Sequence, residues 1–400
     1  MKATYKQVFL GDIAEIFSGG TPSRSNPEYW NGNIPWIKTA QIQNSIINEI
    51  DVDEWITNEA LKKSSAKIVS AGTILMAMYG QGKTRGQVAI LSIDASINQA
   101  CVAIQLKNDI CRDYIYQFLL ASYKHIRNMS NTGGQENLTA SLIREIPILL
   151  PPLPEQKAIA DLLSTWDEAI EKTERLIQAK EMHFQWLLQE LISKPQKNKK
   201  WKKVKLGDIC KIASKEKLIS VKGHFLLTVK LHCLGIERND RIVPKLTKRG
   251  RPYFQHKSGD FLIGRQNFHN GGFGIIPSEL NGGITSNAIS CLIVNESKLL
   301  KEFLFFQFSN PNYYRKTENI MDGTGQKELS DKQILKLNIC LPKIEEQKQI
   351  AETLSIAQHE INLLKQLVDK YKIQKRGLMQ KMLTDTWRIK PEIINQYKEV

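Results

Sequence analysis

The stretch LPPLPEQKAIADLL at residues 150–163 decides the fold, because 191 residues later the chain repeats its pattern as LPKIEEQKQIAETL at 341–354. A second stretch repeats with it: VFLGDIAEI at 8–16 returns as VKLGDICKI at 204–212. The residues between these stretches differ strongly. The sequence therefore predicts two diverged copies of one unit, each followed by the same kind of segment.

The two repeated segments, 150–193 and 341–384, carry apolar residues at alternating steps of three and four. This spacing is that of the a and d positions of a coiled-coil helix, sustained over about five heptads. Each helix would be roughly 55–60 Å long. The predicted seam consists of Ile159, Leu163, Trp166, Ile170, Ile177, Phe184, Leu187, Leu191, Ile350, Leu354, Ile361, Leu364, Val368, Tyr371 and Leu378.

Helices of that length with one apolar stripe must bury the stripe, and the simplest partner is the other copy. An antiparallel pair is favoured, because the ten residues 194–203 reach only about 35 Å, less than a helix length. The alternative is two separate amphipathic helices, each packed on its own domain.

The segments between the helices mix short apolar runs with turns and one helical patch each, which indicates α+β domains. We expect two globular domains separated by two long antiparallel coiled-coil helices, related by a pseudo-two-fold internal repeat. The expected order is a first domain at 1–149, a long helix at 150–193, a second domain at 194–340 that opens with a basic linker at 194–203, a long helix at 341–384 and a tail at 385–400.

Composition favours a nucleic-acid partner. Lys and Arg outnumber Asp and Glu by 56 to 41, which gives a net charge of +15 in 400 residues. A basic balance of this size favours a polyanion, with nucleic acid ahead of a membrane surface. No apolar stretch is long enough for a membrane span or a signal peptide, so we expect a cytoplasmic protein. The cysteines and histidines lack ligand spacing, so we expect core thiols and no metal site.

Each domain also carries a strand, a glycine-rich loop and another strand, and the loops are rich in side chains that pair with base edges. Arg and Lys pair with guanine, and Gln and Asn with adenine. The alternative is a polar surface loop whose glycines serve a turn. The candidate DNA-binding residues in these loops are Gln81, Lys83, Thr84, Arg85 and Gln87 in the first domain, and Arg265, Gln266, Asn267 and His269 in the second. Similar candidates outside the loops are Lys38, Thr39 and Gln41, which follow the Pro-Trp corner of the first domain, and Lys230 and His232 in the second.

Two kinds of short motif resemble parts of catalytic or nucleotide-binding sites, but each lacks a residue that such a site needs. GQGKT at 80–84 has Ala77 where a phosphate-binding loop needs glycine, and a strand follows it instead of a helix. NPEY at 26–29 and NPNY at 310–313 lack the second proline of the adenine methyltransferase signature. Neither motif therefore supports a catalytic site.

Several longer motifs point to one family. They are LGDI near the start of each domain, GGTP followed by YW-x-G-x-IPWI at 19–37, MYG-x-G-x-TRG-x-VAIL at 78–91, and PLPEQKAIADLL at the start of the first long helix. Together they span most of the chain and resemble the DNA specificity (S) subunits of type I restriction-modification systems, which serve bacterial defence. The second domain lacks the GGTP and IPWI elements.

The resemblance implies a non-catalytic subunit in which each target-recognition domain reads one half of a bipartite asymmetric DNA site. The helices would fix the spacer and dock two modification subunits that methylate adenine at N6, and ATP-driven restriction subunits would join them. S-adenosylmethionine, and ATP with Mg, are then expected on those partners, with no cofactor on this chain. Apolar residues off the seam are candidates for that docking or for packing on their own domains: Leu162, Trp186, Ile356 and Leu363.

Two functions from other classes stay open on the sequence. One is a stand-alone DNA adenine methyltransferase or nuclease. The other is a non-catalytic scaffold whose repeated domains bind protein.

Overall fold

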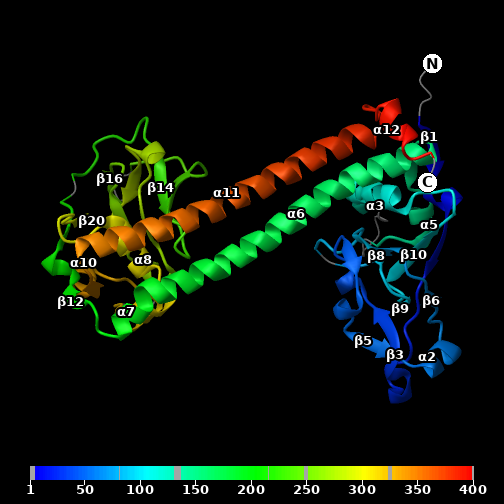
Figure 1. The fold of residues 1–400 in the computed structure, drawn as a ribbon, viewed down its shortest axis with the longest axis horizontal. Helices are drawn as coiled ribbons and strands as arrows, with labels where there is room; N and C mark the ends of the chain where they lie inside the picture. The colour runs from blue at the N-terminus through cyan, green and yellow to red at the C-terminus, as the bar shows by residue number, and fades with distance from the viewer. Residues whose placement is uncertain are drawn as a thin grey trace. The chain divides into compact units, whose positions relative to one another are not determined.

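The computed structural model describes residues 5–80, 82–129, 137–214, 216–246, 251–322 and 327–398. The chain divides into two compact units (Figure 1). Unit 1 contains residues 1–174 and 367–400, and unit 2 contains residues 175–366. Each unit therefore combines a mixed α+β domain with parts of both long helices.

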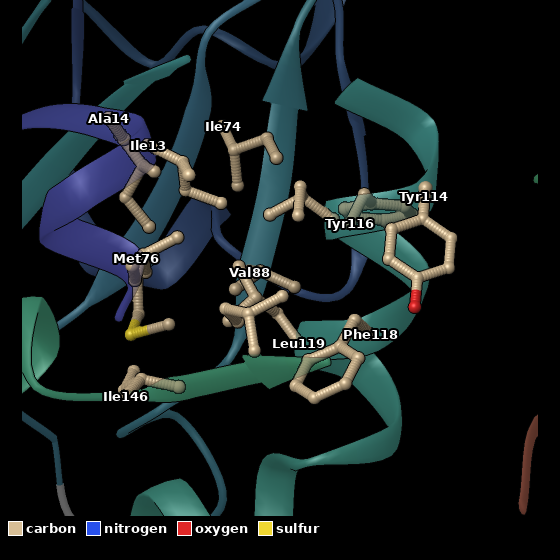
Figure 2. Close-up of a cluster of buried hydrophobic side chains, with 14 of the residues drawn as sticks. Ile13, Ala14, Ile74, Met76, Val88, Tyr114, Tyr116, Phe118, Leu119 and Ile146 are labelled. Carbon is tan, nitrogen blue, oxygen red and sulfur yellow. The ribbon is translucent and has the colours of Figure 1, made fainter. Parts of the chain in front are cut away.

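Unit 1 is built around a five-stranded sheet with a hydrophobic core on each face. Successive side chains along a strand point alternately into the two cores. Ile74 and Met76 belong to a core that α3 (Arg112–Ala121) covers, whereas Leu75 between them belongs to a core on the opposite face. Figure 2 shows the first core, with Val88 beside Phe118 and Leu119. Burial on both faces explains why these strands read as continuous apolar runs. The sheet order is β2 (Ala14–Ser18), β10 (Cys101–Leu106), β7 (Ile74–Ala77), β8 (Val88–Leu91) and β4 (Ser45–Ile47).

A second sheet of unit 1 carries the tryptophan-rich motif. Trp36, on its strand β3, is almost completely buried with Ile56 and Ala60. Its order is β5 (Glu54–Ile56), β3 (Trp30–Ile37), β9 (Ala95–Ile97) and β6 (Ile68–Val69). The other short helices of this unit are α1 (Leu10–Ile13), α2 (Asn58–Lys63), α4 (Tyr123–Asn128), α5 (Ala140–Arg144) and α12 (Pro391–Asn395).

Unit 2 has two four-stranded sheets and an aromatic core. The rings of Phe268, Phe273 and Phe308 lie 5.1–5.5 Å apart between centroids, and Phe308 comes from α8 (Lys301–Phe308). In the first sheet the strand order is β13 (Cys210–Ile212), β20 (Ile289–Val294), β17 (Phe261–Gly264) and β18 (Phe273–Ile275). In the second sheet it is β15 (Ile236–Asn239), β14 (Leu226–Val229), β19 (Ile284–Ser286) and β16 (Tyr253–Gln255). Its other short helices are α7 (Lys194–Lys197), α9 (Pro311–Tyr314) and α10 (Asp331–Lys336).

The long helices α6 (Leu153–Leu188) and α11 (Ile344–Met382) run antiparallel, as predicted. Glu174 pairs with Lys372 at 2.7 Å in unit 1, and Glu181, one heptad later, pairs with Lys365 at 2.6 Å in unit 2. As the residue number increases along α6, the number of its partner on α11 decreases, which is the pattern of an antiparallel pair. The helices pair with each other, so the alternative of separate helices is wrong.

Burial along the helices follows the seam, with one shift near the end of α6. The π-helical turn Gln189–Ser193 follows α6, and here Leu188 and Ile192 are buried, while Leu187 and Leu191 are only partly buried. Such a turn changes the register by about one residue per turn. Among the other seam residues, Ile159, Leu163, Ile177, Phe184, Ile350, Leu354, Ile361 and Val368 are buried, and Trp166, Ile170, Leu364, Tyr371 and Leu378 are half-buried.

The repeated Glu-Gln pair secures the start of each helix. In unit 1, Gln156 donates to the Pro151 carbonyl at 2.9 Å and accepts from the Cys111 N–H at 2.9 Å. In unit 2, Gln347 donates to the Pro342 carbonyl at 3.1 Å and accepts from the Leu300 N–H at 3.0 Å. Each glutamine therefore connects the start of its helix to the adjacent domain, and both copies of the internal repeat carry this residue.

Two further findings bear on the predicted segments. Helical backbone continues past residue 193, from the π-helical turn directly into α7, which contains Pro195. The predicted helix end at 193, and thus the start of the linker, is therefore too early. Among the described residues, no helix is both long and apolar enough to cross a membrane.

Candidate nucleic-acid interface

In unit 1, two groups of predicted DNA-binding residues meet at one end of the central sheet. β4 runs parallel to β8 with Ser45 opposite Ala89, and Asn44 accepts a hydrogen bond from the Val88 N–H at 3.1 Å. The chain from Lys38 to Asn44 leads into β4, and the β7–β8 loop leads into β8. The two segments therefore enter neighbouring strands at the same end of the sheet, where loops commonly carry binding residues.

The predicted DNA-binding residues of the β7–β8 loop differ in their exposure to solvent. Lys83 is exposed, and its carbonyl accepts a hydrogen bond from Tyr123 at 2.6 Å, which anchors the loop. Thr84 and Gln87 are half-buried. Arg85 is only 5% exposed. Gln81 lies outside the described residues.

The β3–β4 segment uses its polar side chains within the fold. Gln41 accepts from the Lys38 N–H at 2.7 Å and donates to the Asp51 carbonyl at 2.8 Å. Lys38 itself contacts Glu54 at 2.6 Å. Thr39 begins the 3-10 turn Thr39–Gln41 and is half-buried. Contact of Gln41 with a base would therefore cost two existing hydrogen bonds.

Arg24 is not among the predicted residues, although it shares a partner with Lys38. Its guanidinium lies 3.9 Å from the ring centre of Trp30 and contacts Glu54 at 2.5 Å. The available signal was an arginine inside the stretch that holds GGTP and IPWI, with two tryptophans in reach. The fold was needed to show that Arg24 and Lys38 share one carboxylate.

Unit 2 brings its two predicted groups together through backbone hydrogen bonds. The turn between β14 and β15 donates from the His232 N–H to the Asn270 carbonyl at 2.7 Å, and from the Cys233 N–H to the Gly271 carbonyl at 2.9 Å. This places Lys230 and His232 beside the loop that follows β17. The two segments form one surface.

Within this surface the exposed polar side chains are those of His232 and Asn267. Arg265 is held by Glu328 at 2.7 Å and donates to the Asn287 carbonyl at 2.6 Å. Lys230 pairs with Glu237 at 3.0 Å. Gln266 and His269 are half-buried. The DNA contacts of all these residues stay a prediction.

Gly271→Ala is expected to detach the β14–β15 turn and lower the stability of unit 2 by about 2 kcal/mol, from strain at positive φ plus lost packing. Gly271 has φ +74°, and an added Cβ would lie 2.9 Å from the Cys233 nitrogen. Gly223→Ala is the matched control, because Gly223 has φ +80° with nothing within 4 Å of its Cβ position. Urea unfolding measures both variants, and equal losses would contradict the packing role.

Two cysteine thiols of unit 2 are poor nucleophiles. Burial raises the pKa of the Cys210 thiol to about 12 and that of the Cys233 thiol to about 11. Both thiols therefore stay protonated and unreactive at neutral pH.

One group of side chains has donor atoms of the kinds that hold metals. His256, Asp260 and Cys291 offer ligand atoms within 4.8 Å of one another. However, His256 Nε2 bonds Thr285 at 2.8 Å, and the Asp260 carboxylate accepts from the Lys257 N–H at 2.9 Å. Three donors fall short of the four of a structural zinc site. The expectation of no metal stays a prediction.

Comparison with known proteins identifies the family of this chain. Residues 2–181 and 198–371 match the family model for the type I restriction modification DNA specificity domain. The chain is 23% identical to the type I restriction enzyme MjaVIII specificity subunit of Methanocaldococcus jannaschii, over 96% of this chain and 93% of that protein. It is 30% identical to the MjaIX specificity subunit of the same organism, over 51% of each.

The fold is similar to that of the type I restriction-modification S subunit from M. genitalium. The TM-score is 0.63 at 14% sequence identity, over 96% of each chain. At this identity the likeness concerns the fold alone.

Proposed function

We propose, because the chain belongs to the type I restriction modification DNA specificity family, that each of its two units reads one half of a bipartite asymmetric DNA site. The chain is a specificity subunit and is not itself catalytic. Its role in the system is DNA recognition. The bipartite site is our extension of that role.

The juxtaposition of two polar segments in each unit carries this proposal. In unit 1 the residues before β4 and β8 form one surface, and in unit 2 the turn between β14 and β15 joins the loop after β17. Loops held on a rigid sheet suit readout of base edges. Because the two surfaces differ in their residues, the two half-sites should differ in sequence.

The paired helices would then fix the number of unread base pairs between the half-sites. Their heptad-spaced ion pairs, Glu174 with Lys372 and Glu181 with Lys365, support a regular antiparallel pairing. Major-groove faces recur about every 34 Å along DNA. A stiff connection of constant length would therefore select one spacing.

Exposed apolar residues on the helices support a proposed docking surface for the two modification subunits. Trp186 is 54% exposed, Ile356 64% and Leu363 51%. Leu162 instead packs partly buried against the core of unit 1, so the alternative of packing on its own domain holds for that residue. The docked subunits would flip an adenine out of the duplex and methylate it with S-adenosylmethionine. ATP-dependent restriction subunits would join this assembly in the cytoplasm.

Selection of bound duplexes from a random pool by the full-length chain tests the proposal. We expect two short enriched blocks of different sequence, separated by a constant number of unselected base pairs. One contiguous block, or no enrichment, would contradict it. Methyl transfer from labelled S-adenosylmethionine to DNA by the purified chain alone would instead support the stand-alone enzyme.

A further inference from the structure

Two cations of unit 1 share one carboxylate. Arg24 Nη1 lies 2.5 Å from Glu54 Oε2, and Lys38 Nζ lies 2.6 Å from Glu54 Oε1. Each cation therefore uses its own oxygen. Asp53 lies further away, at 3.8 Å from Lys38 Nζ. The Arg24 side chain is 55% exposed and those of Lys38 and Glu54 are each 27% exposed, so solvent or a ligand can reach all three.

Two tryptophans hold Arg24 in place. The guanidinium lies 3.9 Å from the ring centre of Trp30 and 4.9 Å from that of Trp36. Trp36 is 2% exposed and donates to the Gly20 carbonyl at 3.1 Å. Stacking on rings fixes the plane of a guanidinium and leaves its edge free to bind an anion.

Glu54 is fixed as firmly as the cations. It lies on β5 directly opposite Trp36 of β3. Its hydrogen bond with Arg24, followed by that with Lys38, lowers the pKa of its carboxyl, so the group is ionised at neutral pH. A carboxylate between an arginine and a lysine presents the same two-oxygen acceptor that a backbone phosphate presents.

The pair also lies next to the proposed reading surface. Lys38 is the residue before the turn Thr39–Gln41, and that turn leads toward β4 and the β7–β8 loop. Phosphate contacts commonly flank base-reading residues and set the register of the protein on the duplex. A cation pair at this position therefore suits a phosphate next to the bases that are read.

We propose that Arg24 and Lys38 form a binding site for one DNA phosphate, and that Glu54 is an internal counter-ion that a phosphate displaces. This inference rests on the proposed function. A phosphate must compete with Glu54, so binding through this site alone is weak. Duplexes that also make base contacts overcome the competition, and Glu54 thereby improves discrimination against other DNA.

Glu54→Gln in the full-length chain tests the inference, with a fluorescent duplex of mixed sequence titrated over a salt series. We expect about fivefold tighter binding, because loss of the competing carboxylate is worth up to about 1 kcal/mol. We also expect the plot of log affinity against log salt to become steeper by about one, since one more phosphate is neutralised without an internal exchange.

Glu59→Gln is the matched control. Glu59 lies on α2 of the same unit and pairs with Lys63 at 2.7 Å, so this variant makes the same charge change away from Arg24 and Lys38. We expect no change in its salt slope. Adding Lys38→Gln to Glu54→Gln should cancel the gain, and circular dichroism confirms that each variant is folded.

Two results would overturn the inference while the proposed function stands. One is a Glu54→Gln chain that binds DNA like the wild type, and the other is a Glu59→Gln chain that reproduces its effect. A wild-type chain that binds no duplex at any salt concentration would overturn the proposed function as well.

Discussion

Arg388→Ala is expected to lower the free energy of unfolding of unit 1 by about 3–5 kcal/mol, because it leaves a buried carboxylate without its partner. The Glu155 side chain is 2% exposed. Arg388 donates to both of its oxygens, at 2.8 Å from Nε and 2.6 Å from Nη2. Tyr5 supplies one further hydrogen bond, at 3.2 Å.

Urea unfolding followed by circular dichroism measures this loss. Tyr397→Phe is the control, because it removes an exposed hydrogen bond to Asp161 on the same helix and should cost less than about 1 kcal/mol. The double variant Glu155→Leu with Arg388→Met should recover most of the stability, since neither charge is then buried. A loss below about 1 kcal/mol for Arg388→Ala would contradict the role of this pair in stabilising unit 1.

Leu354→Ala should destabilise unit 2 by about 2–5 kcal/mol, the usual cost of a cavity at a fully buried leucine. Leu354 is 0% exposed and belongs to the core that joins α11 to the aromatic cluster of unit 2. The same unfolding experiment measures it.

Leu363→Ala provides the matched control on the same helix. Leu363 is 51% exposed, so its truncation should change stability by no more than about 0.5 kcal/mol. Equal losses for Leu354→Ala and Leu363→Ala would contradict the assignment of the buried and exposed faces of α11.

The helices were predictable because a period of 3.5 residues sustained over many turns leaves one face to bury. Leu163 and Leu354, in equivalent positions of the repeat, are both 0% exposed. The period did not reveal the π-helical turn Gln189–Ser193, because such a turn depends on how the helix end meets its domain. Within the turn Ile192 is buried in place of the predicted Leu191, and just before it Leu188 is buried in place of Leu187.

The sequence indicated which segments carry polar side chains that could pair with bases, but it did not indicate which of these segments lie side by side. The chemistry of a glycine-rich loop indicates a surface, but exposure of each side chain depends on packing between distant segments. Arg85 is buried, although its residue type favours contact with guanine. The contact of Arg24 with Glu54 could not be predicted from the sequence, because it depends on the pairing of β3 with β5.

The most direct test of the central claim lengthens the helices and reads the DNA site. Three heptads are inserted into each helix beside the Glu174–Lys372 pair, which keeps the seam in register. Because three heptads add about 31 Å of helix, close to the roughly 34 Å after which the same groove face recurs, the gap between the two selected blocks should grow by about nine base pairs while both blocks keep their sequences. An unchanged gap would contradict the claim that the paired helices set the spacing.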